Sequence, residues 1–454
     1  MAGELKMAGI QGASEALSHF ASNVVWSDLP EAVRHEAKRS LLNFFATSLA
    51  GCRDRAVLSA KSIFDRFSAS QECTVIGHAQ RTDALHGASL NAMSANVFDY
   101  DDTHIPTIIH PTASVAPALL ALAQTRPVTG EDLLTAFAVG VEVECRLGIA
   151  LSPWHYERGW HITSTCGVFG SAVATGRLLG LDQLRMLWAL GHASAQSSGL
   201  VQTLGSMSKS LGVGKAASNG LLAALLAEQG FEGPLCPIEG ARGFLRVMGN
   251  LADEAVLTER LGDSWELMHN TYKPYPCGVV LNPVIEACLA IHHQGNVNVD
   301  GIERAEVTGH PLLRQRTDRP QPASGREAQV SAQHAMAMVL ARGSAGLDEF
   351  SDEAVAGPEA GALSSKTFFV DDSSYGVESA LITLHLRDGR TVCHHVETAR
   401  GSLGAPLTDV DLERKLRTLC AWGGSGCDPQ PLIDAVWSLQ DQDDAGAMML
   451  LTAG

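Results

Sequence analysis

The segment from Asp99 to Ser114 contains the side chains best suited to acid–base chemistry. It reads DYDDTHIPTIIHPTAS and holds three carboxylates and two imidazoles, namely Asp99, Asp101, Asp102, His104 and His110. Carboxylates this close repel one another unless a cation, a shared proton or backbone N–H groups hold them. A solvated acidic loop that caps the following helix would use the same residue types. Alone, the segment leaves a functional and a structural interpretation equally open.

A second polar group precedes another predicted helix. In the segment RGWHITSTCG, His161 and Thr163 stand just before a run rich in glycine and alanine. We expect them near the helix N-terminus, where free backbone N–H groups and the helix dipole favour a bound carboxylate. Taken alone, a histidine beside Trp160 is more often a residue packed in a loop.

The remaining candidates are lysines. Lys209 and Lys215 lie in the apolar, glycine-bearing segment MSKSLGVGK, and Lys273 lies in TYKPYPCG. A lysine in apolar surroundings loses proton affinity and becomes a plausible general base, which an ordinary surface lysine is not. General acid–base groups such as these typically contribute about 10²- to 10⁴-fold in rate.

The elements that must position these groups are mostly helices. Residues 30–50 show apolar side chains at helical spacing, with Ser27-Asp28 as the expected cap and Pro30 in the first turn. Further helices are predicted over 84–97, 114–124, 130–149, 166–179, 182–195, 208–229 and 243–249. Several are rich in Ala, Gly and Ser, so we expect a compact bundle whose central helices approach one another closely.

The pattern changes after about residue 267. A strand is predicted over 302–309, and two further apolar runs, 380–386 and 391–397, flank the hairpin signal Arg387-Asp388-Gly389-Arg390. Helices are predicted over 283–293, 330–340 and 347–353, and helical spacing returns over 408–419 and 430–439. The sequence therefore predicts a mainly α protein with an α+β insert. We expect a discontinuous helical domain (1–266 and 401–454), a smaller α+β lid domain (267–400) and a site in the cleft between them.

The amino-acid composition limits the kinds of partner that the protein is expected to bind. At 454 residues, 45% hydrophobic and 18% charged, the chain is expected to fold into two well-buried domains. A net charge of −17 argues against nucleic acids and anionic membranes as partners, because phosphate binding needs a basic face. The ten cysteines show no CxxC pair, which favours reduced thiols and a cytoplasmic location. No signal peptide or membrane-spanning segment is predicted.

A metal is the main alternative for the acidic segment, since its aspartates and histidines could ligate a divalent ion. Asp and His also cluster in metal-free acid–base sites, and His394 and His395 fall on opposite faces of a predicted strand. We therefore predict no metal and no organic cofactor. A non-enzymatic scaffold or binding protein is a further alternative, and the number of polar clusters argues against it.

Together these motifs resemble the MmgE/PrpD family along nearly the whole chain. The blocks DYDDTH…HPTASVAPALLALA, GWHITSTCGVFGSAVA, LGLDQL, ALGHASAQSSGL, SKSLGVGKAASNG and KPYPC follow the family order. The family contains 2-methylcitrate dehydratases, cis-aconitate decarboxylases and iminodisuccinate epimerases. The resemblance implies a large helical domain with a smaller α/β lid, a homodimer, and catalysis without a cofactor.

The resemblance also implies site residues. Catalytic positions would fall on Asp99, Thr103, His110, His161 and Lys209. Beside these positions, we expect Asp102, Thr163, Lys273 and His334 to bind the substrate. Asp99 would orient an imidazole or lysine, and Thr103 would position a substrate oxygen.

The chain departs from the family pattern at several positions. Many members carry a histidine where this chain has Gly212 and another near Asn282, and relatives often have a tyrosine at the position of His334. The loop between Thr103 and His110 is one residue longer than in the decarboxylases. By overall resemblance the chain is most similar to the iminodisuccinate epimerases, so we expect a cofactor-independent epimerase of iminodisuccinate.

An epimerase removes a proton from one face of a carbon and returns it on the other, so two opposed bases suffice. We expect His161 and Lys209 to form this pair, with His110 as an alternative partner. A tetracarboxylate substrate would explain why lysines and histidines gather within an acidic protein. A hydro-lyase of the 2-methylcitrate dehydratase type, or a decarboxylase, would use the same bases differently, and both remain alternatives.

Overall fold

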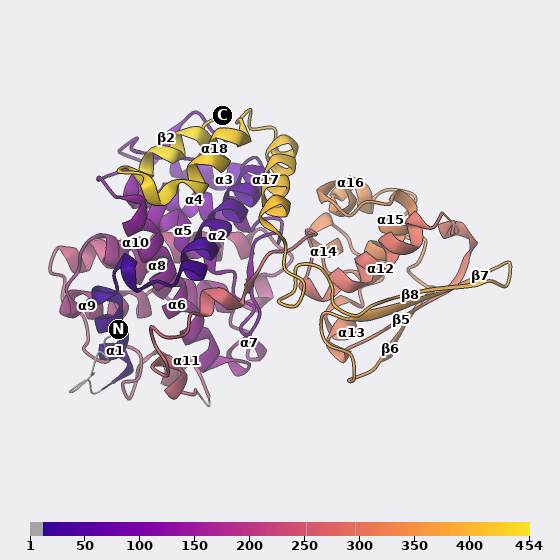
Figure 1. Cartoon of the computed structure of the whole chain (residues 1–454), viewed down its shortest axis with the longest axis horizontal. Coiled ribbons are helices and arrows are strands. Elements are labelled where there is room, and N and C mark those ends of the chain that lie inside the picture. The colour runs from indigo at the N-terminus through magenta and orange to yellow at the C-terminus, as the bar shows by residue number, and fades with distance from the viewer. Residues whose placement is uncertain (1–11, 251, 296) are drawn as a thin grey trace. The chain divides into compact units, whose positions relative to one another are not determined.

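The computed structural model describes residues 12–250, 252–295 and 297–454. It contains two compact units, each described here by itself (Figure 1). The helical unit comprises residues up to 97, 101–270 and 409–454, and the mixed unit comprises 98–100 and 271–408. The expected borders at 267 and 401 lie a few residues from these. The short segment 98–100 falls with the mixed unit, although its neighbours on both sides belong to the helical unit.

The helical unit consists of helices joined by short loops. Its helices are α1 (Ala13–Asn23), α2 (Glu31–Gly51), α3 (Arg55–Phe64), α4 (Ala84–Asn96), α5 (Pro111–Ala123), α6 (Gly130–Leu151), α7 (Trp154–Glu157), α8 (Ile162–Leu178), α9 (Gln183–Ser194), α10 (Ser208–Glu228), α11 (Phe244–Met248), α17 (Asp409–Gly423) and α18 (Pro429–Trp437). The short strands β1 (Cys73–Thr74) and β2 (Arg81–Thr82) pair antiparallel, and β3 (Thr103–His104) pairs with β4 (Asn270–Thr271). This architecture confirms the mainly α prediction.

Helix α8 lies at the centre of this unit, and its small residues explain how. Every residue of α5 is buried, as is α8 from Ile162 to Gly176. A Cβ on Gly140 of α6 would lie 2.7 Å from the carbonyl oxygen of Gly170, and one on Gly220 of α10 would lie 2.7 Å from that of Val168. Side chains larger than hydrogen would separate these backbones. The predicted close approach of Gly/Ala-rich helices is therefore confirmed.

The mixed unit is built on one four-stranded sheet of order β6-β5-β7-β8. Its strands are β5 (Ile302–Gly309), β6 (Thr367–Asp371), β7 (Ala380–Leu386) and β8 (Thr391–Val396). Strand β5 runs parallel to β6 and antiparallel to β7, with Val307 opposite both Phe369 and Ile382. The helices are α12 (Asn282–His293), α13 (Pro311–Thr317), α14 (Gly325–Ala328), α15 (Ala332–Arg342) and α16 (Asp352–Val355). Alternate residues of β7 are buried in one core with α12 and α15, so the sheet has one apolar face.

Three local predictions need correction. Pro30 itself is the N-cap of α2, while Ser27 and Asp28 lie in a separate 3-10 turn in which Asp28 accepts a hydrogen bond from the Val25 N–H. Strand β6 was not predicted. The single helix 347–353 is instead a 3-10 turn, Leu347–Phe350, followed by α16.

One helix, α10, is long and apolar enough to cross a bilayer by length and composition. Its apolar window is 61% buried within the structure, where it packs against α8 and α4. This is also the pattern of a core helix in a large helical bundle.

Candidate active site

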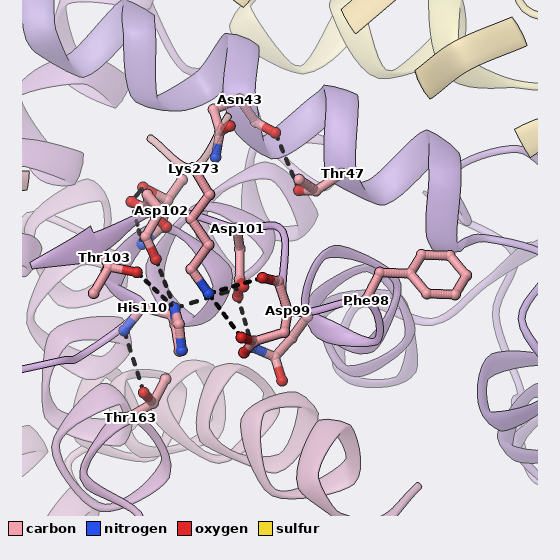
Figure 2. Close-up of polar contacts among 12 residues, drawn as sticks. Asn43, Thr47, Phe98, Asp99, Asp101, Asp102, Thr103, His110, Thr163 and Lys273 are labelled. Carbon is pink, nitrogen blue, oxygen red and sulfur yellow. Dashed lines mark hydrogen bonds and ion pairs between the residues drawn. The ribbon is translucent and has the colours of Figure 1, made fainter. Parts of the chain in front are cut away.

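Two histidines occupy equivalent positions at the starts of central helices. His110 is the N-cap residue of α5, and His161 is the N-cap residue of α8. The backbone N–H of His110 donates to Thr163 Oγ1 (3.2 Å), so the two helix N-termini lie side by side (Figure 2). The positive dipole ends of both helices therefore lie close together, although Pro111 at the start of α5 has no N–H and Asp102 accepts the Thr112 N–H. Such a region favours bound carboxylates.

The ring of His110 is held by the acidic segment that precedes it. Its Nδ1 lies 2.6 Å from the carbonyl oxygen of Asp102, and 3.5 Å from both Asp101 Oδ1 and Thr103 Oγ1. A carbonyl oxygen only accepts, so Nδ1 carries the proton and donates it. In the neutral ring Nε2 is then the basic nitrogen. Asn96 fixes Asp101 by donating from Nδ2 to Asp101 Oδ2 (2.6 Å).

The side chain of Asp102 makes its hydrogen bonds within the fold. Its side chain is fully buried, and Oδ2 accepts from the Thr112 N–H (3.3 Å), the Thr112 hydroxyl and Asn270 Nδ2 (2.6 Å). Burial raises the pKa of Asp102 to about 7, although the hydrogen bonds from Thr112 and Asn270 oppose the shift. Oδ1 has no hydrogen-bond partner in the described part of the chain. The predicted substrate-binding role of Asp102 is therefore not supported.

His161 is positioned by α8 and by two glycines. Its backbone N–H donates to the Gly199 carbonyl (3.1 Å), and its Nδ1 lies 2.7 Å from Ser164 Oγ. A Cβ on Gly199 would lie 2.6 Å from Ser164 Cβ, and one on Gly212 would lie 2.8 Å from Ser164 Oγ. Any side chain at 212 would displace the hydroxyl that holds the His161 ring. The glycine that departs from the family histidine at this position therefore has a local steric reason.

Lys209 lies in the first turn of α10, one turn before Gly212. Residues three apart share a helix face, so Lys209 is on the side of α10 that faces Ser164 and His161. The surrounding segment differs from its prediction. Residues 204–208 are exposed, Lys209 is half-buried, and Lys215 is exposed with its Nζ 5.5 Å from the Phe64 ring centre. The apolar burial that was expected of Lys209 and Lys215 is therefore not observed.

Thr163 is also buried and acts on the backbone. Its hydroxyl accepts the His110 N–H, which ties the start of α5 to the first turn of α8. Thr163 thus positions the start of α5, and its role in substrate binding stays a prediction. Thr103 is likewise almost inaccessible, with its hydroxyl turned toward the His110 ring.

The remaining candidates belong to the mixed unit. Lys273 Nζ, nearly inaccessible, donates to the carbonyl oxygen of Asp99 (2.7 Å) and to its Oδ2 (2.9 Å). Tyr100 donates its hydroxyl to the Pro274 carbonyl (2.7 Å), and Gln329 Nε2 donates to the Phe98 carbonyl (2.5 Å). Lys273 thus holds the 98–100 segment through Asp99. Asp99 has a left-handed backbone (φ 51°), which Asp adopts more readily than most residues.

His334 is a core residue of the mixed unit. It is fully buried in α15, its Nε2 lies 2.7 Å from the Glu349 carbonyl, and its ring packs near Phe350. Burial lowers the pKa of His334, which keeps the ring neutral. A ring enclosed in this way has no path to a substrate, so the predicted substrate-binding role of His334 is not supported.

Several positioning residues had no signal in the sequence. Asn96 and Asn270 reach Asp101 and Asp102 from segments 5 and 168 residues away. Thr112 and Ser164 lie inside motifs that were noted, but as part of the polar pattern and not as partners of Asp102 and His161.

Comparison with known proteins decides the family. The MmgE/PrpD N-terminal domain matches residues 15–255, and the MmgE/PrpD C-terminal domain matches residues 275–440. The chain belongs to the MmgE/PrpD family. These two matches together span most of the helical unit and most of the mixed unit, and they confirm the family predicted from the motifs.

Relatives in the MmgE/PrpD family include named enzymes of one kind. The chain is 28% identical to the cis-aconitate decarboxylase of Homo sapiens, over 94% of this chain and 91% of that protein. It is 28% identical to the cis-aconitate decarboxylase of Aspergillus terreus, over 90% and 89%, and 25% identical to that of Mus musculus, over 98% and 94%. These relatives favour the lyase alternative over the epimerase reading, which they do not support.

Proposed function

We propose that this chain is a lyase that decarboxylates a cis-aconitate-like unsaturated tricarboxylate by general acid–base catalysis. The observation that carries the proposal is the pairing of His110 and His161 at two adjoining helix N-termini. This arrangement offers two imidazoles beside a region that favours carboxylates. The decarboxylases named above support the reaction class at about 28% identity.

The chemistry needs few groups. In cis-aconitate one carboxylate is attached to a CH₂ group next to the C=C bond. When the C–CO₂ bond breaks, its electron pair forms a new C=C bond, and the former double-bond electrons take up a proton at the far carbon. The products are CO₂ and methylenesuccinate, and one proton is consumed. The enzyme must hold the other carboxylates and deliver that proton.

The helical unit supplies groups for both tasks. The positive N-terminal ends of α5 and α8, and the ammonium of Lys209, would hold the spectator carboxylates and offset the net charge of −17. His110 or His161 would deliver the proton, His110 from Nε2 because its Nδ1 donates to the Asp102 carbonyl. We propose that no organic cofactor is involved and that the protein is a homodimer. Light scattering on the eluted peak tests the dimer.

The deciding experiment incubates the protein with cis-aconitate in D₂O and follows proton NMR and CO₂. Methylenesuccinate with a single deuterium in its saturated CH₂ group is the expected product. Deuterium exchange at Cα of iminodisuccinate without CO₂ would show the epimerase instead. Water loss from methylcitrate would show the hydro-lyase, and no turnover with any substrate would favour a scaffold. Each of these three results overturns the decarboxylase proposal.

A matched pair of lysine variants tests the site. Lys209→Met should lower the rate by about 10²-fold or more, the lower end expected for an acid–base or charge-stabilising group. Lys215 lies on the same helix but is exposed, so the decarboxylation rate of the Lys215→Met variant should stay near that of the wild type. Equal rates for the two variants would remove Lys209 from the mechanism.

A further inference from the structure

A second group of titratable side chains converges near the surface of the helical unit. His104 Nε2 lies 3.1 Å from Glu266 Oε2, and His269 Nδ1 lies 3.0 Å from the same oxygen. The three potential ligand atoms all lie within 4.8 Å of one another. The side chain of His104 is fully buried, that of Glu266 is 14% exposed and that of His269 is 50% exposed. The group therefore has an enclosed side and an open side.

The enclosed ligand is oriented by a hydroxyl. His104 Nδ1 lies 2.7 Å from Thr107 Oγ1, which also accepts the Ile109 N–H (3.2 Å). A hydroxyl oxygen has two acceptor positions, so it can accept from both Ile109 and the His104 Nδ1–H. With the proton on Nδ1, Nε2 of His104 can offer its lone pair to a cation that takes the place of its contact with Glu266. Metal-ligating histidines in proteins are fixed in this way by a partner on the other ring nitrogen.

The other two ligands are fixed through the backbone. The Glu266 N–H donates to Glu142 Oε2 (2.6 Å), and Glu142 is paired with Arg146 (2.5 Å) in the buried interior. The Ile105 N–H donates to the His269 carbonyl (3.2 Å), which joins the two ligand-bearing segments. The arrangement is thus part of the fold and does not depend on the exposed side chain alone.

We propose that His104, Glu266 and His269 bind one divalent first-row transition metal cation such as Zn²⁺. Zn²⁺ binds His nitrogen and carboxylate oxygen at about 2.0–2.2 Å, so neighbouring ligand atoms in a tetrahedral site are about 3.3 Å apart. The two observed carboxylate–imidazole separations are within a few tenths of an ångström of this value. Two imidazoles and one carboxylate form a common ligand set for such ions, with water in the remaining position.

The cation would replace any proton shared between Glu266 and the two rings. It would also cross-link the loop after Thr103 to the segment around Glu266.

The test is binding of Zn²⁺ and Co²⁺ to the chelator-stripped full chain, by calorimetry and visible absorption. One saturating equivalent is expected, and bound Co²⁺ should show no thiolate charge-transfer band. His269→Ala and Glu266→Gln should remove this equivalent. Both are conservative for folding, since His269 is half exposed and Gln is isosteric with Glu. Thr107→Val should weaken binding by about 10- to 100-fold, the usual effect of losing the partner of a ligating histidine.

The control is His86→Ala. His86 also pairs with a carboxylate, Asp83 (2.6 Å), but has no third ligand nearby among the groups identified in the described chain. The His86→Ala variant should bind the metal as tightly as the wild type does. The proposal is overturned if the wild type shows no saturable binding, if His269→Ala binds as tightly as the wild type, or if Co²⁺ shows thiolate ligation from the ten cysteines.

Discussion

The Nδ1 atom of His110 lies 2.6 Å from the backbone carbonyl oxygen of Asp102, eight residues earlier in the chain. Because a carbonyl accepts and never donates, this contact selects the His110 tautomer with the proton on Nδ1. The basic nitrogen is therefore Nε2. The loop between the two residues places the ring in front of the α5 N-terminus, where it is 8% exposed.

This hydrogen bond allows a substitution that separates the role of Nδ1 from the role of Nε2. The side-chain nitrogen of an asparagine occupies the place of His Nδ1, so His110→Asn should keep the hydrogen bond to the Asp102 carbonyl while it removes the basic nitrogen. We expect kcat for decarboxylation to fall by about 10²- to 10⁴-fold with little change in stability. Steady-state kinetics and urea unfolding measure the two effects. His110→Gln keeps a polar atom near Nε2 but breaks the loop contact, so it should lose stability as well as rate. A His110→Asn enzyme within a few-fold of wild type would exclude His110 as acid or base.

Asp102 gives a prediction for stability as a function of pH. Its pKa is raised from 3.8 to about 7 by burial, so the native state binds this proton more tightly than the unfolded state. The stability that it contributes is fully present below about pH 4 and is lost as pH rises through about 7. The shift corresponds to roughly 4 kcal/mol at most. Asp102→Asn mimics the protonated carboxyl and cannot ionise.

The measurement is the free energy of unfolding of wild type and Asp102→Asn between pH 5 and 8. As pH rises, the free energy of unfolding of Asp102→Asn should increase relative to that of the wild type, by an amount on the order of 1–3 kcal/mol across this range. Buried acids whose pKa does not depend on Asp102, such as Glu142, affect both proteins equally and cancel in the difference. A difference that does not vary with pH would mean that Asp102 is ionised throughout.

The helices were predictable from the sequence, but their first turns were not. Apolar spacing gave α5 and α8 starts at 114 and 166, whereas the helices begin at Pro111 and Ile162. The missed residues are polar, namely Thr112, Thr163 and Ser164, and each is buried with a hydrogen-bond partner, which for Thr163 is 53 residues away. The spacing of apolar residues in a sequence indicates which apolar side chains are buried, but not which polar ones are. For this reason the sequence placed His110 and His161 near the helices but could not show that each is the N-cap residue.

The candidate residues were predictable as a group and not as individual roles. Asp102, Thr163 and His334 have the residue types of a binding site, and the structure shows each of them buried and engaged in internal hydrogen bonds. Residue type records what a side chain can do, whereas its role depends on which atoms the fold places beside it. The partners of Asp102 illustrate this, because Asn270 is 168 residues away.

The pair of Lys273 and Asp99 should stabilise the mixed unit measurably. Lys273 is almost completely buried and Asp99 is 22% exposed, so the pair is screened less than a surface ion pair. A double-mutant cycle with Lys273→Met and Asp99→Asn should give a coupling free energy of about 1–3 kcal/mol in urea unfolding. Arg390 and Asp388 form the control pair in the same unit, more than half exposed. Their coupling should be clearly smaller than that of Lys273 and Asp99, because solvent screens an exposed ion pair. Similar coupling for both pairs would show that Lys273 does not hold the 98–100 segment.

Ile108 carries backbone strain in the loop between the two histidines of the acidic segment. It has φ 60°, in the left-handed region that a β-branched residue avoids at a cost of about 1–2 kcal/mol. Glycine adopts this conformation freely, so Ile108→Gly should relieve the strain while it loses a half-buried side chain and adds chain entropy. These effects nearly cancel, and the free energy of unfolding should change by less than about 1 kcal/mol. Ile109→Gly is the matched control, because Ile109 is fully buried, and it should cost about 3 kcal/mol or more. If the two glycine variants were equally destabilised, the left-handed backbone at Ile108 would store no strain.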